Sequence, residues 1–226
     1  MHPLLLLALV ALPTLAAEPA PSGHDATIRH RFDDPKHWAA IFDDPARDAW
    51  QKPDDVIGFL AVKPGAVVAD LGAGTGYFTV RLARAVGPEG KVLAVEIEPN
   101  LVDHLKKRAL EAGLKQVVPV LAEPSDPKLP PAGVDLVLVC DTWHHIDDRV
   151  HYLGRLAAAL RPGGRVAIVD FKEGELPVGP PPAHKLSRAA IVDELKEGGF
   201  SLASEKSDLP YQYVLVFTPN AKPAAR

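Results

Sequence analysis

A glycine-rich run in the first half of the chain carries the residue types best suited to binding a ligand through the backbone. It is Asp70-Leu71-Gly72-Ala73-Gly74-Thr75-Gly76, which follows an apolar stretch and precedes a stretch with helical periodicity. Glycines in a turn between a strand and a helix let the backbone approach a ligand closely. Glu96 closes the next apolar run, where its carboxylate can accept hydrogen bonds from two ribose hydroxyls. The pattern predicts a nucleoside-binding loop rather than a plain strand-to-helix turn.

The spacing of these glycines separates two kinds of ligand. Dinucleotide-binding folds use G-x-G-x-x-G, which presents a helix N-terminus to a pyrophosphate. This loop reads G-x-G-x-G, and Asp70 directly before it would repel a pyrophosphate. A carboxylate there suits a ligand with a sulfonium and an ammonium group, so the sequence favours S-adenosylmethionine over a nicotinamide dinucleotide. The alternatives are a dinucleotide oxidoreductase and a non-catalytic protein that binds S-adenosylmethionine or another adenosine ligand.

A second group of reactive side chains follows a later apolar run, in the segment Cys140-Asp141-Thr142-Trp143-His144-His145. Ligands of open α/β sheets bind beyond the carboxyl ends of the strands, so this segment is expected near the glycine-rich loop. The candidate catalytic residues are His144, His145 and Asp141, because an imidazole can take a proton from an acceptor near neutral pH. Asp141 is also a candidate cofactor ligand, and Trp143 a candidate wall of the pocket. The alternative is that one of the two histidines caps the following helix.

Composition gives little support for metal or nucleic-acid binding. His and carboxylate residues gather between His144 and His151, but Asp147 or Asp148 is better placed as a helix cap, so no metal site is predicted. Cys140 is the only cysteine, which excludes an intramolecular disulfide and a multi-thiolate centre. The net charge is −4, and no run of Lys or Arg would neutralise a phosphate backbone. We therefore expect a small-molecule acceptor and no nucleic-acid partner, and leave the oligomeric state open.

The elements that must position these residues alternate in a regular order. Short apolar runs separated by helical stretches predict βαβ units and a largely parallel sheet. The last two strands are too close in sequence for a parallel crossover and must form an antiparallel hairpin. The predicted fold is α/β, a doubly wound, mostly parallel sheet of seven strands with an antiparallel C-terminal hairpin. The predicted strands cover residues 67–71, 91–96, 117–121, 134–140, 165–170, 200–203 and 213–217.

Start and stop signals for helices complete this outline. Aspartates before prolines predict helices that begin near Pro35 and Pro45, and Pro53-Asp54-Asp55 predicts a third start. Apolar residues at helical spacing predict four more helices, over residues 78–86, 101–109, 150–160 and 189–196. The pair Gly163-Gly164 is expected to end the third of these.

With these motifs in order, residues 56–218 resemble a class I S-adenosylmethionine-dependent methyltransferase. The matching motifs are residues 70–76 as cofactor loop, Glu96 as ribose acid, residues 134–137 as fourth strand and residues 160–165 as the turn before the fifth. The resemblance implies a Rossmann-like fold, S-adenosylmethionine as cofactor and methyl transfer as activity. The chain departs from the family after the third strand, where Gly-Asp-Ala often contacts adenine and this chain has Ala122-Glu123-Pro124-Ser125-Asp126. Glu123, Asp126 or a backbone amide is left to make that contact.

Three further segments resemble a group of bacterial family members that often carry export signals: Trp50-Gln51-Lys52-Pro53, His144-His145-Ile146 and Tyr211-Gln212-Tyr213. This resemblance makes Trp50 and Gln51 candidate neighbours of the cofactor, in a helical segment that either packs on the domain or closes over the pocket as a lid. The Asn-Pro-Pro-aromatic motif of amide-nitrogen methylation is absent after the fourth strand. Together with the likeness of the loops to quinone-type methyltransferases, this implies a small, apolar or quinone-like acceptor.

The N-terminus has the composition of a secretory signal. Residues 3–17 are apolar apart from Thr14, too short to span a membrane, and end in small residues suited to cleavage. The expected organisation is a signal at 1–17, a flexible leader at 18–31, a helical lid at 32–64, the methyltransferase domain at 65–218 and a tail at 219–226. Cleavage would make the protein periplasmic or secreted, without stable membrane insertion. A membrane-anchored or cytoplasmic protein is the alternative, because the segment lacks the Lys or Arg of a typical signal.

Overall fold

The computed structural model describes residues 34–220. The predicted signal and leader lie outside these residues, so both stay predictions. None of the helices in the described part of the chain has the length and apolar character needed to span a bilayer.

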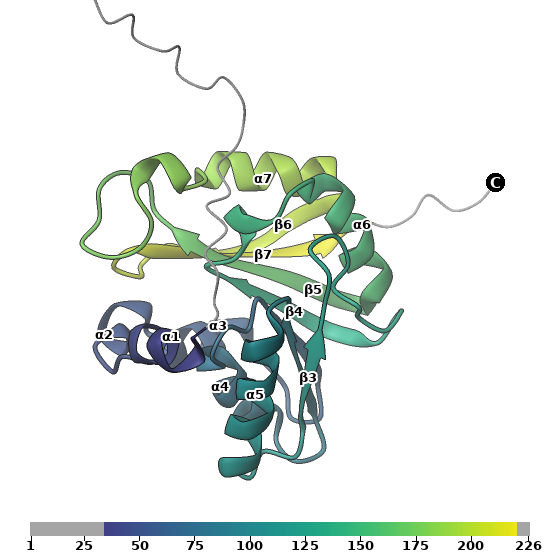
Figure 1. The fold of residues 1–226 in the computed structure, drawn as a ribbon. Helices are drawn as coiled ribbons and strands as arrows, with labels where there is room; N and C mark the ends of the chain where they lie inside the picture. Colours follow the sequence, from purple (N-terminus) through teal and green to yellow (C-terminus); the bar gives the residue numbers. More distant parts are fainter. Residues whose placement is uncertain (1–33, 221–226) are drawn as a thin grey trace, which may run out of the picture.

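A seven-stranded sheet forms the centre of the domain, with the strand order β3-β2-β1-β4-β5-β7-β6 (Figure 1). Neighbouring strands are parallel, except that β7 runs antiparallel to both β5 and β6. The predicted fold class and C-terminal hairpin are therefore confirmed. The strands are β1 (Val67–Leu71), β2 (Lys91–Glu96), β3 (Val117–Leu121), β4 (Val134–Cys140), β5 (Leu160–Phe171), β6 (Phe200–Lys206) and β7 (Gln212–Pro219).

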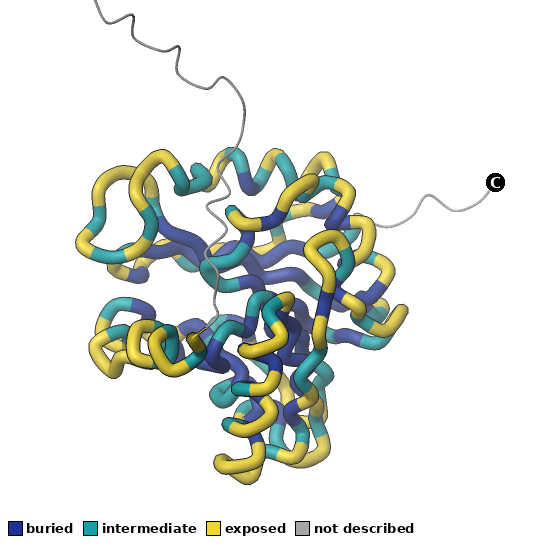
Figure 2. Tube along the Cα trace, viewed as in Figure 1, coloured by how far each residue is buried: buried dark blue, intermediate teal, exposed yellow. Residues whose placement is uncertain are grey.

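Helices cover both faces of this sheet, which is why the central strands are apolar on both sides. On one face, α3 (Pro53–Leu60), α4 (Tyr77–Val86) and α5 (Pro99–Glu111) contribute buried apolar residues to one core cluster. On the other face, α6 (Arg149–Ala159) and α7 (Arg188–Glu197) contribute to a second cluster. Figure 2 shows the result, with dark blue strands inside and yellow outer turns of the helices.

The order of the strands fixes where a ligand can bind. From β1 the chain moves outward to β2 and β3, and then returns to the other side of β1 with β4 and β5. The reversal opens a crevice beyond the carboxyl ends of β1 and β4, which is the usual ligand position in open α/β sheets. Both the glycine-rich loop and the segment after Cys140 leave the sheet at this edge.

Two short helices precede α3, namely α1 (Pro35–Phe42) and α2 (Arg47–Gln51). Asp34 caps α1 as predicted, because its carboxylate accepts hydrogen bonds from the backbone amides of Lys36 and His37. The helix expected near Pro45 begins later, at Arg47. Asp44 instead accepts a hydrogen bond from the Ala46 amide, which holds this stretch as a turn.

The fifth strand differs most from its prediction. It begins at Leu160 instead of residue 165, because Leu160 pairs with Val134 at the start of β4. The register with β4 shifts after this pair, so that the strand carries an irregularity before Arg165. The pair Gly163-Gly164 therefore lies inside β5 and does not end α6, which stops at Ala159. The first predicted residues of β6 and β7 are nearly right, but both strands run longer than predicted.

Candidate active site

The glycine-rich loop has the backbone geometry that only glycine adopts readily. Gly72, Gly74 and Gly76 have φ angles of 71°, 56° and 96°. The amides of Gly72 and Ala73 both donate to the carbonyl of Val95, which ties the loop to the end of β2. A Cβ at Gly72 would lie 2.3 Å from Oγ1 of Thr142, so the loop and the segment after β4 are in direct contact.

Glu96 ends β2 with its carboxylate surrounded by backbone amides. Oε2 accepts a hydrogen bond of 2.9 Å from the Gly74 amide, and Oε1 accepts bonds from the amides of Ile97 and Glu98. Burial raises the pKa of this carboxyl group, and the three amide donors oppose the rise. The loop and the acid that sequence reasoning paired are therefore brought together.

Asp70 is buried at the end of β1 and points to the first turn of α4. Its carboxylate accepts a hydrogen bond of 2.5 Å from the Thr79 hydroxyl. Burial raises the pKa of Asp70 to about 6, although the Thr79 hydrogen bond lowers it and Glu96 raises it further. The side chain thus joins the strand to the helix directly under the glycine-rich loop.

Asp141 lies directly after β4 in a left-handed conformation, with a φ of 54°. Its carboxylate accepts one hydrogen bond from the side-chain amide of Gln212 and forms a 3.0 Å ion pair with Arg47 of α2. Gln51 continues the network, since its side-chain amide donates to the carbonyl of the Gln212 side chain. Burial raises the pKa of Asp141 to about 6, with Arg47 opposing the rise. The network joins α2, β4 and β7 at the site.

His144 lies in the short 3-10 helix η1 (Trp143–His145) and is held by a residue that sequence reasoning did not single out. Its Nδ1 lies 3.2 Å from Oδ2 of Asp170, which is fully buried near the end of β5. The other carboxylate oxygen of Asp170 accepts a hydrogen bond from the Phe171 amide. Asp170 was predicted only as the end of a strand. Because ligands bind beyond the carboxyl ends of the strands, that position alone could have marked it as a candidate site residue.

The charge state of His144 follows from these neighbours. Burial lowers the pKa of its imidazole, but the hydrogen bond to Asp170 and the negative charges of Asp170 and Asp141 outweigh it, so the pKa is raised overall. His145 is exposed, and its ring centroid lies 4.2 Å from that of His144. Neither histidine caps α6, because the Asp148 carboxylate accepts the hydrogen bond from the His151 amide.

Trp143 does not line the site. Its side chain is completely buried in the core cluster beneath α6 and α7, where the indole N–H donates to Glu194. A second contact, between Arg149 and Glu194, fixes the same carboxylate. The turn of η1 therefore directs Trp143 into the core, whereas His144 contacts Asp170 and His145 is exposed.

Glu123 and Asp126 follow β3 in a small turn in which their backbones pair with each other. Both carboxylates form ion pairs with Lys128, at 2.9 and 3.1 Å. The turn follows the strand that neighbours β2, so it lies beside the Glu96 edge. A cofactor contact from either residue stays a prediction.

Residues 42–51 lie over the glycine-rich loop. The Phe42 ring would be 3.6 Å from a Cβ placed on Gly74, and Asp43 forms a 2.6 Å ion pair with Arg108 of α5. Asp48 accepts hydrogen bonds from the Tyr77 hydroxyl and from Arg81, both on α4. The segment that contains α2 is therefore fastened across the edge where the cofactor loop leaves the sheet, as a lid would be.

Trp50 belongs to an aromatic cluster next to this network. Its ring centroid lies 5.8 Å from that of Phe171 and 6.2 Å from that of Tyr211. The guanidinium of Arg47 lies 5.8 Å from the centroid of the Trp50 ring, so the cluster adjoins the Arg47–Asp141 network. None of the three aromatic side chains belongs to the two core clusters.

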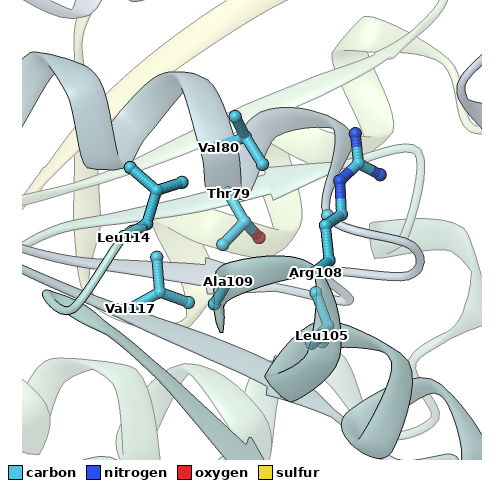
Figure 3. Close-up of a pocket in the computed structure, with 8 residues that line it drawn as sticks. Thr79, Val80, Leu105, Arg108, Ala109, Leu114 and Val117 are labelled. Carbon is cyan, nitrogen blue, oxygen red and sulfur yellow. The ribbon is translucent and has the colours of Figure 1, made fainter. Parts of the chain in front are cut away.

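Two other candidate features carry no site. The described residues contain no group of three or more His, Cys, Asp or Glu side chains that could hold a metal ion. A narrow gap between α4 and α5 has no room for a water molecule and is lined mostly by aliphatic side chains, with the stem of Arg108 beside them (Figure 3). The lining includes neither Glu96 nor Asp141 nor His144, so this pocket is a gap in helix packing.

Comparison with known proteins finds similarity to methyltransferases. Residues 68–164 match the family described as a methyltransferase domain. The chain is 31% identical over 135 residues to the aklanonic acid methyltransferase DauC of Streptomyces sp., covering 59% of this chain and 61% of the relative. It is 28% identical over 125 residues to a demethylmenaquinone methyltransferase of Bacillus cytotoxicus, covering 55% of this chain and 52% of the relative. The chain thus spans between half and two thirds of the length of these curated relatives.

A solved structure agrees over a larger share of the chain. The SAM-dependent methyltransferase from Aquifex aeolicus superposes with a TM-score of 0.77 at 27% identity, covering 81% of this chain and 97% of that one. Residues 68–164 are therefore similar to methyltransferase domains, and the sheet has the Rossmann-like fold of these structural neighbours. More particularly, the matched family and the S-adenosylmethionine-dependent structural neighbour imply S-adenosylmethionine as the cofactor.

The residues at the sheet edge fit this cofactor. Thr75 is buried in the loop, and among the described residues its hydroxyl has no hydrogen-bond partner, so a polar ligand atom would satisfy it. Glu96 presents a carboxylate suited to ribose hydroxyls. Ile97 and Leu121 follow at the ends of β2 and β3 with 48% and 53% of their surface exposed, which suits one face of an adenine ring. Asp141 and Arg47 add one negative and one positive charge next to the glycine-rich loop.

Proposed function

We propose that this chain transfers a methyl group from S-adenosylmethionine to a small, apolar or quinone-like acceptor, and that His144 takes the acceptor's proton. The observation that carries the proposal is the buried contact between His144 and Asp170 at the carboxyl edge of the sheet. When bound, S-adenosylmethionine supplies a methyl group on a positively charged sulfur, whose bond to carbon breaks as the acceptor atom bonds to the methyl.

Asp170 is a positioning residue in this proposal. With Nδ1 of His144 donating to the carboxylate, Nε2 carries the lone pair and becomes the atom that accepts a proton. The carboxylate also stabilises the imidazolium that forms, which is why the pKa of His144 is raised despite burial. A base of this kind is needed for an acceptor whose hydroxyl or carbon must lose a proton, and not for a neutral amine.

The acceptor class is supported by two further observations. The Trp50, Phe171 and Tyr211 rings form an aromatic cluster next to Arg47, of the kind that flat, poorly polar ligands bind. The matched relatives include one named for aklanonic acid and one named for demethylmenaquinone. We extend these names to this chain as a class of acceptor and not as a particular compound.

The test is an assay of S-adenosylhomocysteine release from the full chain with a panel of phenols, hydroquinones and primary amines. We expect turnover with the first two groups, and a decrease of about 10²- to 10⁴-fold in His144→Gln. His145→Gln is the matched control, because its ring is the exposed neighbour of His144. If His145→Gln loses activity and His144→Gln does not, the assignment of the base is wrong. Stoichiometric cofactor binding with no transfer to any acceptor would favour the non-catalytic binding protein.

A further inference from the structure

Among the described residues, two ion pairs fasten α2, and the one between Arg47 and Asp141 is the more deeply buried. Arg47 and Asp141 are 94 residues apart in sequence, and their side chains are only 13% and 21% exposed. The ion pair between Asp48 and Arg81 is of similar length, but its carboxylate is 50% exposed. A charge as buried as that of Arg47 or Asp141 is costly without a partner, so each must keep a partner of opposite charge.

Arg47 is held in place independently of Asp141. Its Nε donates to the side chain of Gln51 and its Nη1 to the carbonyl of Phe42, each at 3.0 Å. Its guanidinium also lies 4.1 Å from the centroid of the Tyr77 ring. Only Nη2 is directed at Asp141. A different carboxylate could therefore replace Asp141 without any other contact of Arg47 being lost.

Asp141 is equally fixed without Arg47. Its backbone amide donates to the Val169 carbonyl, and its other carboxylate oxygen accepts the hydrogen bond from Gln212. The oxygen that faces Arg47 can therefore accept a hydrogen bond from any cation brought to the same place.

Both residues adjoin the cofactor loop. The guanidinium of Arg47 lies over the ring of Tyr77, which directly follows Gly76. Thr142, which directly follows Asp141, packs against Gly72. The ion pair therefore spans the loop from its last glycine to its first. The amino-acid end of S-adenosylmethionine carries one carboxylate and one ammonium group, which are complementary to these two residues.

We infer that Arg47 binds the carboxylate and Asp141 the ammonium group of S-adenosylmethionine, and that binding exchanges the Arg47–Asp141 ion pair for these two. The inference rests on the proposed use of this cofactor and extends it to α2. The lid then contributes a ligand of its own, because Arg47 belongs to it. The internal ion pair keeps both charges partnered before the exchange.

The test is calorimetric titration of the full chain with two ligands at one pH. S-adenosylhomocysteine keeps the amino-acid end, and 5′-methylthioadenosine lacks it. Arg47→Met should weaken S-adenosylhomocysteine binding by about 10- to 100-fold, as expected for a lost charge-assisted hydrogen bond, and leave 5′-methylthioadenosine within about threefold. Arg81→Met is the matched control, since Arg81 also stacks on Tyr77 at 4.1 Å and fastens α2. It should change neither affinity by more than about threefold.

Two results would overturn the inference. If Arg47→Met weakens both ligands equally, or if Arg81→Met matches it, the ion pair only fastens the lid. If the unaltered chain binds 5′-methylthioadenosine as tightly as S-adenosylhomocysteine, neither Arg47 nor Asp141 binds the amino-acid end of the ligand. Circular dichroism of each variant separates loss of folding from loss of binding, and Asp141→Asn provides a second disruption that should also discriminate between the ligands. The experiment measures binding alone, so a failure to find any methyl acceptor does not affect it.

Discussion

Replacing Gly72 by alanine is expected to be the most damaging single-methyl change in the cofactor loop. The new Cβ would lie 2.3 Å from Oγ1, 2.4 Å from Cγ2 and 2.8 Å from Cβ of Thr142. Rotation of Thr142 about its first side-chain bond moves the first two atoms but not Cβ, so rotation cannot relieve the overlap. The φ of 71° adds backbone strain, because this region is unfavourable for any residue with a Cβ.

The chain contains a control that separates the two costs. Gly65 has a similar φ of 79°, but a Cβ there would meet nothing within 4 Å. Gly65→Ala should therefore cost only the backbone strain, about 1 kcal/mol of unfolding free energy. Gly72→Ala should cost about 2 to 4 kcal/mol, because overpacking adds about 1 to 3 kcal/mol to the backbone strain.

Urea unfolding of the unaltered chain and the two variants measures these differences, and calorimetry with S-adenosylhomocysteine measures the accompanying loss of binding. Gly72→Ala should also weaken binding, because the clash moves the loop away from the segment after β4. The added change Thr142→Ala removes Oγ1 and Cγ2 and should recover part of the stability. Equal destabilisation by Gly65→Ala and Gly72→Ala would refute the close contact between the loop and Thr142.

Three further predictions concern charge and processing. His144 must be neutral to accept a proton, so activity should rise with pH through its raised pKa; in Asp170→Asn that rise should move to lower pH, with activity about 10²- to 10⁴-fold lower. An unchanged pH–rate profile in this variant would contradict the assigned pairing. Burial raises the pKa of Asp70 from 3.8 to about 6, so the stability that its protonated form provides is complete below pH 3.8 and is lost as the pH rises through 6. Asp70→Asn should therefore gain about 1 to 3 kcal/mol relative to the unaltered chain between pH 4 and pH 8 in urea unfolding, and a pH-independent difference would count against it. Finally, expression of the full chain in a bacterium that processes its signal should yield a protein whose first residue, by N-terminal sequencing, is Glu18; an intact N-terminus at Met1 would support the uncleaved alternatives.

Local patterns in the sequence determined most of the fold and half of the site. Strand bounds at β1 to β4 follow from apolar runs whose ends are marked by glycine, proline or a charged residue. The caps at Asp34 and Asp148 follow from hydrogen bonds that span three residues or fewer. The glycine-rich loop and Glu96 could be paired because a βαβ unit brings consecutive strand ends to one edge.

Tertiary structure decided the contacts between residues that no local pattern relates. The pairing of His144 with Asp170 depends on β4 and β5 being neighbours and on where β5 ends. The sequence prediction placed the start of β5 five residues late, at residue 165 instead of Leu160. The burial of Trp143 depends on which way η1 turns against α6 and α7. The Arg47–Asp141 ion pair forms only when α2 folds back over the sheet edge. Apolar periodicity reports which face of an element is buried, whereas the partner of a buried charge is set by the packing of whole elements against one another.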